Sequence, residues 1–105
     1  MSAESQLEER MRRWVTARGG LYLKWVSPGN DGVPDRIIIL NGHVVFHELK
    51  TDTGELEVSQ ERMIPRIEAA LAAGPPGVRT PQVRVTYGAE GLEELMTELI
   101  ALGVA

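Results

Sequence analysis

Apolar residues recur at helical spacing in three stretches of the chain. Between Ser5 and Arg18 they stand three or four positions apart, which predicts an amphipathic helix that ends at Gly19-Gly20. A second helix is expected from about Val58 or Ser59 to Ala73, before the helix-stopping pair Gly74-Pro75. A last helix follows Gly91. Its predicted apolar face consists of Leu92, Leu95, Met96, Leu99 and Leu102.

Four further stretches are rich in β-branched and aromatic residues, which is typical of strands. They are Leu21–Val26, the two halves of residues 34–50, and Gln82–Tyr87. The order helix, three strands, helix, strand, helix predicts an α/β domain with a mixed sheet. The 105 residues contain no internal repeat, so we expect a single domain over residues 1–105.

The stretch from Pro34 to Lys50 is the centre of the predicted sheet. Its two apolar runs flank Asn41-Gly42, a pair that favours a two-residue type I′ turn because both turn positions need a positive φ angle. Counting outward from this turn places Asp35 opposite Glu48. Both faces of the hairpin are largely apolar, so we expect it to be central and buried.

Asp35 and Glu48 would then be like charges on one face, which is destabilising unless something offsets the repulsion. Lys50 projects from the same face, since strand side chains alternate with period two. Two carboxylates and one ammonium group can form an ordinary surface cluster. They also form the kind of site that a divalent cation with oxygen ligands needs, and the buried strands favour this second interpretation.

Polar residues on both predicted helices point toward the same site. Glu4 and Glu8 lie on the flank of the apolar stripe of the first helix, and either could reach the site, although Ser5 and Glu8 also fit a capping box. Gln60 falls in the middle of the apolar face of the second helix, for which Ser59 is the expected N-cap. Pro65 predicts either a kink in that helix or a regular part that begins near it.

The chain has a net charge of −4 and no cysteine, which excludes disulfides and thiolate zinc sites. Phosphate binding would depend on local clusters of cations, for which the candidates are Lys24, Arg36, Arg12 and Arg13. No run approaches the ~20 apolar residues of a membrane span, and residues 1–6 contain no apolar segment of a signal peptide. We therefore expect an intracellular protein.

Several motifs together resemble one known family. They are Gly-Gly at the end of the first helix, Lys24, Ser-Pro-Gly-Asn-x-Gly-Val-Pro-Asp-Arg at 27–36, Phe-x-Glu-Leu-Lys at 46–50, and Ser59-Gln60. This set is similar to the VRR-NUC (virus-type replication and repair nuclease) domain of the PD-(D/E)xK nuclease superfamily. The resemblance covers about Glu4 to Gly74, and the chain departs from the pattern at Pro65 and in the loop 75–81.

The resemblance implies a restriction-endonuclease-like αβββαβ core, here with an extra C-terminal helix. It also implies a DNA endonuclease that requires Mg²⁺ or Mn²⁺, with metal ligands from Asp35, Glu48, the Leu49 carbonyl and Glu8. Lys50 would orient or activate the attacking water, and Gln60 would hold Lys50 or a phosphate. Small domains of this kind are similar to homodimeric phage nucleases that act on branched DNA such as four-way junctions, which implies a phage or bacterial cytoplasmic setting.

Two other functions stay open at this point. The chain could be a catalytically silent nucleic-acid-binding or assembly module, although such a module has no reason to keep a destabilising carboxylate pair. It could also be a restriction-type or RNA-cleaving nuclease. His43 and His47 lie on the opposite strand face from Glu48, so we expect core or edge histidines rather than ligands.

Overall fold

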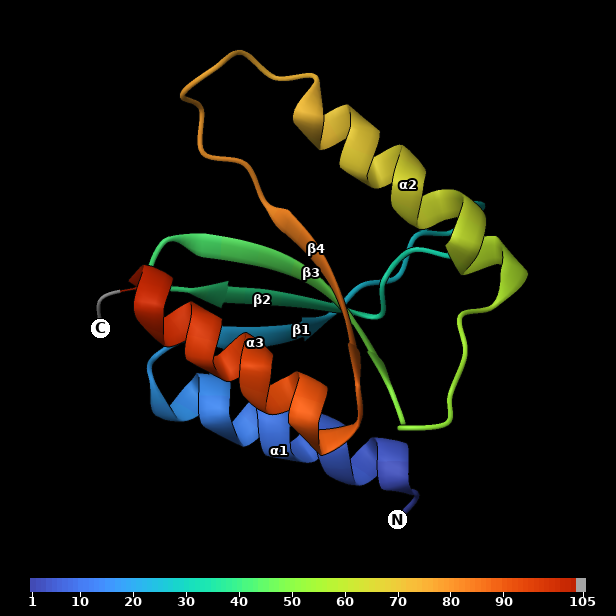
Figure 1. Cartoon of the computed structure of the whole chain (residues 1–105), viewed down its shortest axis with the longest axis vertical. Helices are drawn as coiled ribbons and strands as arrows, with labels where there is room; N and C mark the ends of the chain where they lie inside the picture. Colours follow the sequence, from blue (N-terminus) through green and yellow to red (C-terminus); the bar gives the residue numbers. More distant parts are fainter. Residues whose placement is uncertain (104–105) are drawn as a thin grey trace.

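A computed structural model describes residues 1–103 of the chain, with the side chains of residues 1–101. The elements, in chain order, are α1 (Ala3–Ala17), β1 (Leu21–Lys24), β2 (Arg36–Leu40), β3 (His43–Lys50), α2 (Val58–Ala72), β4 (Gln82–Tyr87) and α3 (Gly88–Gly103) (Figure 1). This order confirms the predicted α/β class, including the extra C-terminal helix. None of the helices within residues 1–103 is long and apolar enough to cross a membrane.

The four strands form one mixed sheet in the order β1-β2-β3-β4. The first two pairings are antiparallel, and β3 and β4 are parallel. The predicted turn is confirmed, because Leu40 pairs with His43 and the turn residues Asn41 and Gly42 have φ angles of 50° and 80°. The hairpin therefore occupies the centre of the sheet in the predicted register.

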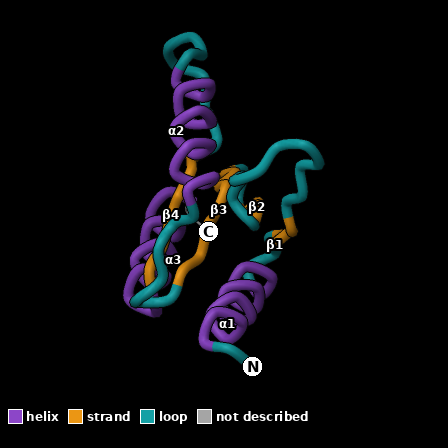
Figure 2. The backbone as a smooth tube through the Cα atoms, turned by 90° about the vertical axis from the view of Figure 1, so that its right-hand side faces the viewer, coloured by secondary structure: helices purple, strands orange, loops and turns teal. Residues whose placement is uncertain are grey.

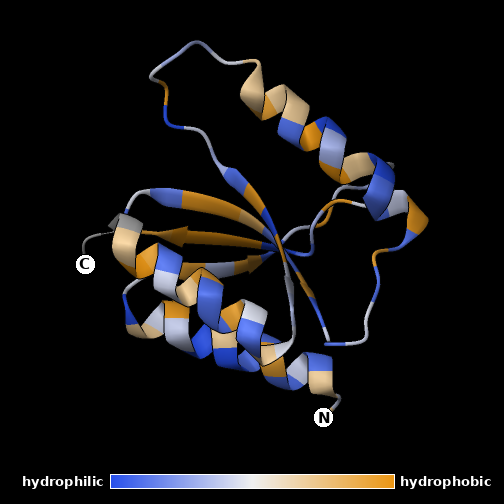
Figure 3. Cartoon of the chain, viewed as in Figure 1, coloured by the Kyte–Doolittle hydropathy of each residue, from blue (hydrophilic) through white to orange (hydrophobic). Residues whose placement is uncertain are grey.

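Helices cover both faces of the sheet, with α1 and α3 on one side and α2 on the other (Figures 1 and 2). The main core lies between the sheet and the α1–α3 pair, where the largely apolar strands meet the apolar sides of these helices (Figure 3). Among its members are Met11 and Val15 of α1, Ile38 of β2 and Val45 of β3. The predicted apolar face of the last helix is buried at Leu92, Leu95, Met96 and Leu99, whereas the side chain of Leu102 lies outside the described ones.

The predicted start of α2 at Val58 is confirmed, but the caps of α1 and α2 differ from those that the sequence suggests. The N-cap of α1 is Ser2, whose hydroxyl accepts the Ser5 N–H at 3.1 Å, so Ser5 is inside the helix and does not cap it. The N-cap of α2 is Glu57 rather than Ser59, and the Gln60 side chain accepts the Glu57 N–H at 2.9 Å in a capping box.

Pro65 lies inside α2, which begins seven residues earlier at Val58. The regular part of this helix therefore does not begin at Pro65. The side chain is exposed, so the proline ring does not disturb the buried face of α2. Gln60 and Ile64 form the buried face of the helix next to this position.

Candidate active site

Glu48 is a buried carboxylate at the end of the central hairpin. Its side chain is 1% exposed, and its Oε1 atom accepts the backbone N–H of Asp35 at 3.0 Å. Lys50 Nζ lies 3.3 Å from the other carboxylate oxygen, Oε2, and the Lys50 side chain is 12% exposed. Asp35 stands directly before β2 and is exposed. The predicted meeting of Asp35, Glu48 and Lys50 at one place is thus present in the structure.

The surroundings of Glu48 disfavour its charged form. Burial is the main cause that raises the pKa of the Glu48 carboxyl, and the nearby charge of Asp35 raises it further. The Asp35 amide and Lys50 act in the opposite direction. A buried carboxylate beside a second one is stabilised by a cation, which is the role of Lys50 here.

The same donor set fits a divalent cation. Asp35 and Glu48 offer carboxylate oxygens and Leu49 a backbone carbonyl, all of them hard oxygen ligands of the kind that Mg²⁺ and Mn²⁺ prefer. Among residues 1–103, no three acidic or histidine side chains converge tightly enough to form a complete metal cluster by themselves. The remaining ligands would have to be water, phosphate oxygens or the backbone.

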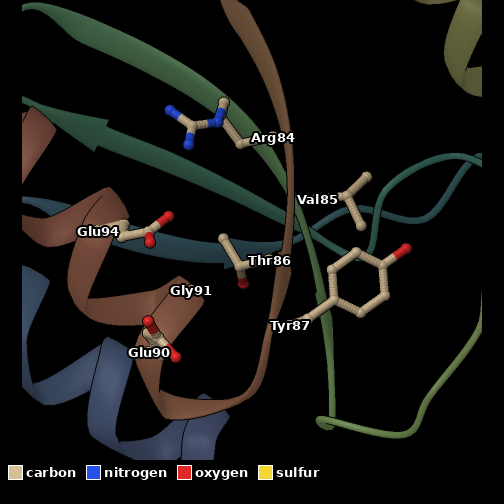
Figure 4. A pocket seen from close by; sticks show the side chains of 7 residues that line it. All are labelled: Arg84, Val85, Thr86, Tyr87, Glu90, Gly91 and Glu94. Atoms are coloured by element: carbon tan, nitrogen blue, oxygen red, sulfur yellow. The ribbon is translucent and has the colours of Figure 1, made fainter.

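The site opens on the α2 side of the sheet. In the parallel pairing of β3 with β4, Glu48 pairs with Val85 and Lys50 pairs with Tyr87. Val85 and Tyr87 point away from α3, whereas Arg84 and Thr86 point toward it (Figure 4). Since neighbouring strand residues share a face, Glu48 and Lys50 also face away from α3.

His47 lies on the other face, as predicted, and is a core histidine. Its ring is fully buried, with Nε2 2.8 Å from the Thr86 hydroxyl oxygen. Burial, with a smaller contribution from Arg84, lowers the pKa of His47 to about 4. This histidine is therefore neutral at physiological pH and is not directed at the carboxylates. His43 is half-buried at the start of β3.

Glu8 reaches the sheet from α1, but an arginine holds it there. Arg36 donates to Glu8 Oε2 at 3.0 Å, and both side chains are about three-quarters buried, at 24% and 25% exposure. Arg36 pairs with His47 across the hairpin, so this ion pair lies on the α1 side of the sheet. Glu8 is thus not part of a capping box, and it contacts Arg36 rather than the Asp35–Glu48 pair.

Tyr22 lies beside Arg36, and its position was not predicted from the sequence. Its hydroxyl is buried without a hydrogen-bond partner among the described residues, and the Arg36 guanidinium lies 5.3 Å from its ring centroid. Burial is the main cause that raises the pKa of this phenol; Arg36 lowers it, and the carboxylates of Glu8, Asp35 and Glu48 raise it further. No sequence motif marks this tyrosine.

The remaining predicted residues come from α2, β1 and α1. Gln60 is buried at 7% exposure, and its side-chain oxygen is engaged in the capping box of α2. Lys24 is exposed at the end of β1, in the position that pairs with Arg36. Lys24 thus lies with Arg36 on the α1 side of the sheet, whereas Glu48 and Lys50 face the α2 side. Arg12 and Arg13 both form ion pairs with Glu9 on the outer side of α1.

Comparisons with known proteins support the fold. The chain is similar to a solved structure described as "VRR_NUC domain", with a TM-score of 0.76, 23% sequence identity, and coverage of 92% of this chain and 97% of that chain. The protein therefore has the fold of the VRR_NUC domain, a restriction-endonuclease-like fold. No family model matches the sequence.

A curated relative comes from a phage. The chain is 44% identical over 48 residues to "Putative nuclease p44" of Acyrthosiphon pisum secondary endosymbiont phage 1. The match covers 45% of this chain and 52% of the relative, so it spans about half the length of that protein.

Proposed function

We propose that this protein is a divalent-metal-dependent nuclease that hydrolyses phosphodiester bonds in DNA. The observation that carries the proposal is the convergence of Asp35, Glu48 and Lys50 on the fold of the VRR_NUC domain. A buried carboxylate beside a second one costs stability, and a fold that needed no cation or phosphate there would gain from an apolar residue. The phage relative that is named a nuclease supports the same activity.

Asp35, Glu48 and the Leu49 carbonyl would hold the metal ion. Mg²⁺ or Mn²⁺ supplies polarisation of the phosphate and a lowered pKa of bound water. Glu48 is held in place for this role by the backbone amide of Asp35. The Asp35 side chain is exposed and can reach the substrate. Glu8 would act through water or through Arg36, with which it is paired.

Lys50 would bind and orient a water molecule or a phosphate group on the substrate side of the site. Its ammonium group is 3.3 Å from Glu48 and retains a slight exposure, so it can also donate to a water molecule or a phosphate oxygen. A positive charge at this place stabilises the negative charge that develops on the phosphate in the transition state. Gln60 would support this side of the site from the first turn of α2.

The finer parts of the proposal concern the substrate and assembly. We infer a preference for branched DNA such as four-way junctions, a homodimer, and a role inside a phage-infected or bacterial cell. These points rest on the sequence resemblance and on the phage origin of the relative. A homodimer would place two sites on one junction, as paired cleavage of two of its four strands requires.

A cleavage panel tests the proposal. Linear duplex, flap and four-way-junction DNA, with a matched RNA duplex, are incubated with Mg²⁺ or Mn²⁺ and with EDTA, and the protein is run on a sizing column. We expect metal-dependent cutting of DNA, strongest on the junction, by a dimer. Cutting of RNA alone would assign the site to an RNA nuclease. Binding without cutting of any substrate would identify a silent module.

A further inference from the structure

We propose that a groove between the loop 25–33 and α2 is the track along which the nucleic-acid strand enters the site, with its phosphates held by Arg62 and Arg66. This inference rests on the proposed function and extends it to a binding surface. The groove consists of two adjoining cavities of about 290 Å³ and 300 Å³. Asn30, Met63 and Arg66 line both of them.

The groove has two cations on α2, Arg62 and Arg66, that are free to bind an anion. Of the 11 Lys and Arg residues, six form ion pairs with acids: Arg10, Arg12, Arg13, Arg36, Lys50 and Arg84. Arg62 and Arg66 form none within residues 1–103, and both are exposed. They stand four positions apart, so they lie on one side of α2 about 6 Å apart along its axis.

This spacing suits a phosphate backbone. A nucleic-acid strand carries one negative charge for about every 3.4 Å of duplex axis, so two guanidinium groups on one helix side can meet nearby phosphates of the same strand. Arginine is well suited to such contacts because its planar group donates in a fork to phosphate oxygens.

The groove leads directly to the carboxylates. Val33 lines it and stands two residues before Asp35, a span of at most about 7 Å between Cα atoms. Trp25, also in its lining, donates its backbone N–H to the Asp35 carbonyl at 2.8 Å. On the α2 side, Ser59 lines the groove next to the buried Gln60. A strand lying in the groove would therefore present a phosphate to Asp35.

The wall of the groove is held in place by a close approach of backbones. Gly32 has a φ angle of 87°, and a Cβ atom there would overlap the Ser59 carbonyl. The loop thus rests directly on the first turn of α2. The floor is apolar and can pack against sugars or an unpaired base. Its Trp25 ring packs at a tilt of 38° against Phe46, with 4.8 Å between the ring centroids.

Negative charge on the α3 side of the molecule disfavours the approach of a nucleic-acid strand from that side. The cavity between β4 and α3 is lined by Glu90 and Glu94 (Figure 4), and a neighbouring one adds Glu93 and Glu98. The one cation that lines the first of these cavities, Arg84, is paired with Glu98. A polyanion is repelled there and attracted to the α2 groove.

Binding measurements on charge-matched variants test the groove. Asp35→Asn protein is titrated onto a fluorescein-labelled four-way junction and a duplex at several salt concentrations, followed by fluorescence anisotropy. Adding Arg62→Ala and Arg66→Ala should weaken binding by about tenfold to a hundredfold. It should also lower the slope of log affinity against log salt by about two, one for each lost phosphate contact.

The control removes the same charge from the side of α3, where Arg10 is paired with Glu93 and Arg84 with Glu98. Arg10→Ala with Arg84→Ala should leave affinity and salt slope within about twofold of the parent. Asp31→Asn removes the acid that lines the groove and should strengthen binding. Unchanged binding by the Arg62 and Arg66 variant, or an equal loss in the Arg10 and Arg84 variant, would overturn the inference.

The two proposals fail in different ways. Because binding is measured on a variant that cannot use Asp35, the groove can be confirmed even if the wild type cuts no substrate. Conversely, metal-dependent cutting by a protein whose binding ignores Arg62 and Arg66 would sustain the nuclease and remove the groove. Circular dichroism melts of each variant show whether it is folded at the assay temperature.

Discussion

Replacing His47 with glutamine should greatly reduce the stability that this protein loses when the pH is lowered. The ring is fully buried in the core between β3, β4 and α3, and Nδ1 has no hydrogen-bond partner within the described residues. Protonation would place a charge in this apolar setting, near the cation of Arg84. Both effects lower the pKa of His47 in the folded protein from its ordinary 6.5 to about 4.

The direction of the pH effect follows from proton uptake. Between pH 6.5 and pH 4 the unfolded chain binds a proton at His47 and the folded chain does not, so acid favours unfolding. At about 1.4 kcal/mol for each pH unit, the free energy of unfolding falls by about 3 kcal/mol between pH 7 and pH 4 because of this one residue. The loss begins near the ordinary histidine pKa and ends near the lowered one.

Urea unfolding at pH 7, 6, 5 and 4 in EDTA measures this difference. His47→Gln should be less stable than the wild type at pH 7 but should lose about 3 kcal/mol less on acidification. Thr86→Val removes the hydrogen-bond partner of His47 and keeps the buried ring, so it should be destabilised and retain the wild-type pH dependence. Parallel stability curves for wild type and His47→Gln would refute the buried neutral histidine.

Three further predictions concern the loop and the site. Gly32→Ala should lower the free energy of unfolding in urea by about 2 kcal/mol, because the positive φ angle and the Ser59 carbonyl leave no room for a methyl group. Gly29→Ala, with open space around it, should lower it by about half as much. Lys50→Met should destabilise the protein by about 2 kcal/mol at pH 7, because it leaves the buried Glu48 carboxylate unpaired. Adding Glu48→Gln should restore most of this loss, since no unpaired buried charge then remains. A double variant no more stable than Lys50→Met would contradict the ion pair. Glu8→Gln should slow cleavage less than Asp35→Asn does, because Glu8 is held by Arg36; equal losses would place Glu8 in contact with the reacting phosphate.

The central hairpin could be predicted from the sequence because its signals are local. Asn41-Gly42 determines the turn, the period-two pattern determines the faces, and together they place Asp35 beside Glu48. Lys50 follows from the same alternation. These three residues could therefore be assembled without knowledge of any contact between distant elements.

The contacts between elements could not be predicted in the same way. Ser5 and Glu8 have capping-box spacing, but a serine three residues earlier caps α1, and Glu8 is then free to pair with Arg36. That ion pair joins residues 28 positions apart, and nothing in the local pattern of either one indicates it. For the same reason the partial burial of Arg36 and the position of Tyr22 beside it were not predictable.

The start of α2 shows a competition between two possible caps. Ser59 is a favoured N-cap residue, yet the capping box between Glu57 and Gln60 satisfies the backbone groups of the first turn and extends the helix to Val58. Gln60 was expected on the inner side of this helix, and it is buried there. Its hydrogen bond to the helix start, rather than to Lys50, emerges only from the three-dimensional structure.

The rate of metal-dependent DNA cleavage by wild-type protein and three variants tests the account most directly. With Mn²⁺ in excess, Asp35→Asn and Lys50→Met should each reduce the cleavage rate by a factor of about a hundred or more, while EDTA abolishes it. Glu94→Gln, which changes the charge on α3 by the same amount as Asp35→Asn, should cut at the wild-type rate. Cleavage by folded Asp35→Asn or Lys50→Met at the rate of the wild type would show that the reaction takes place elsewhere.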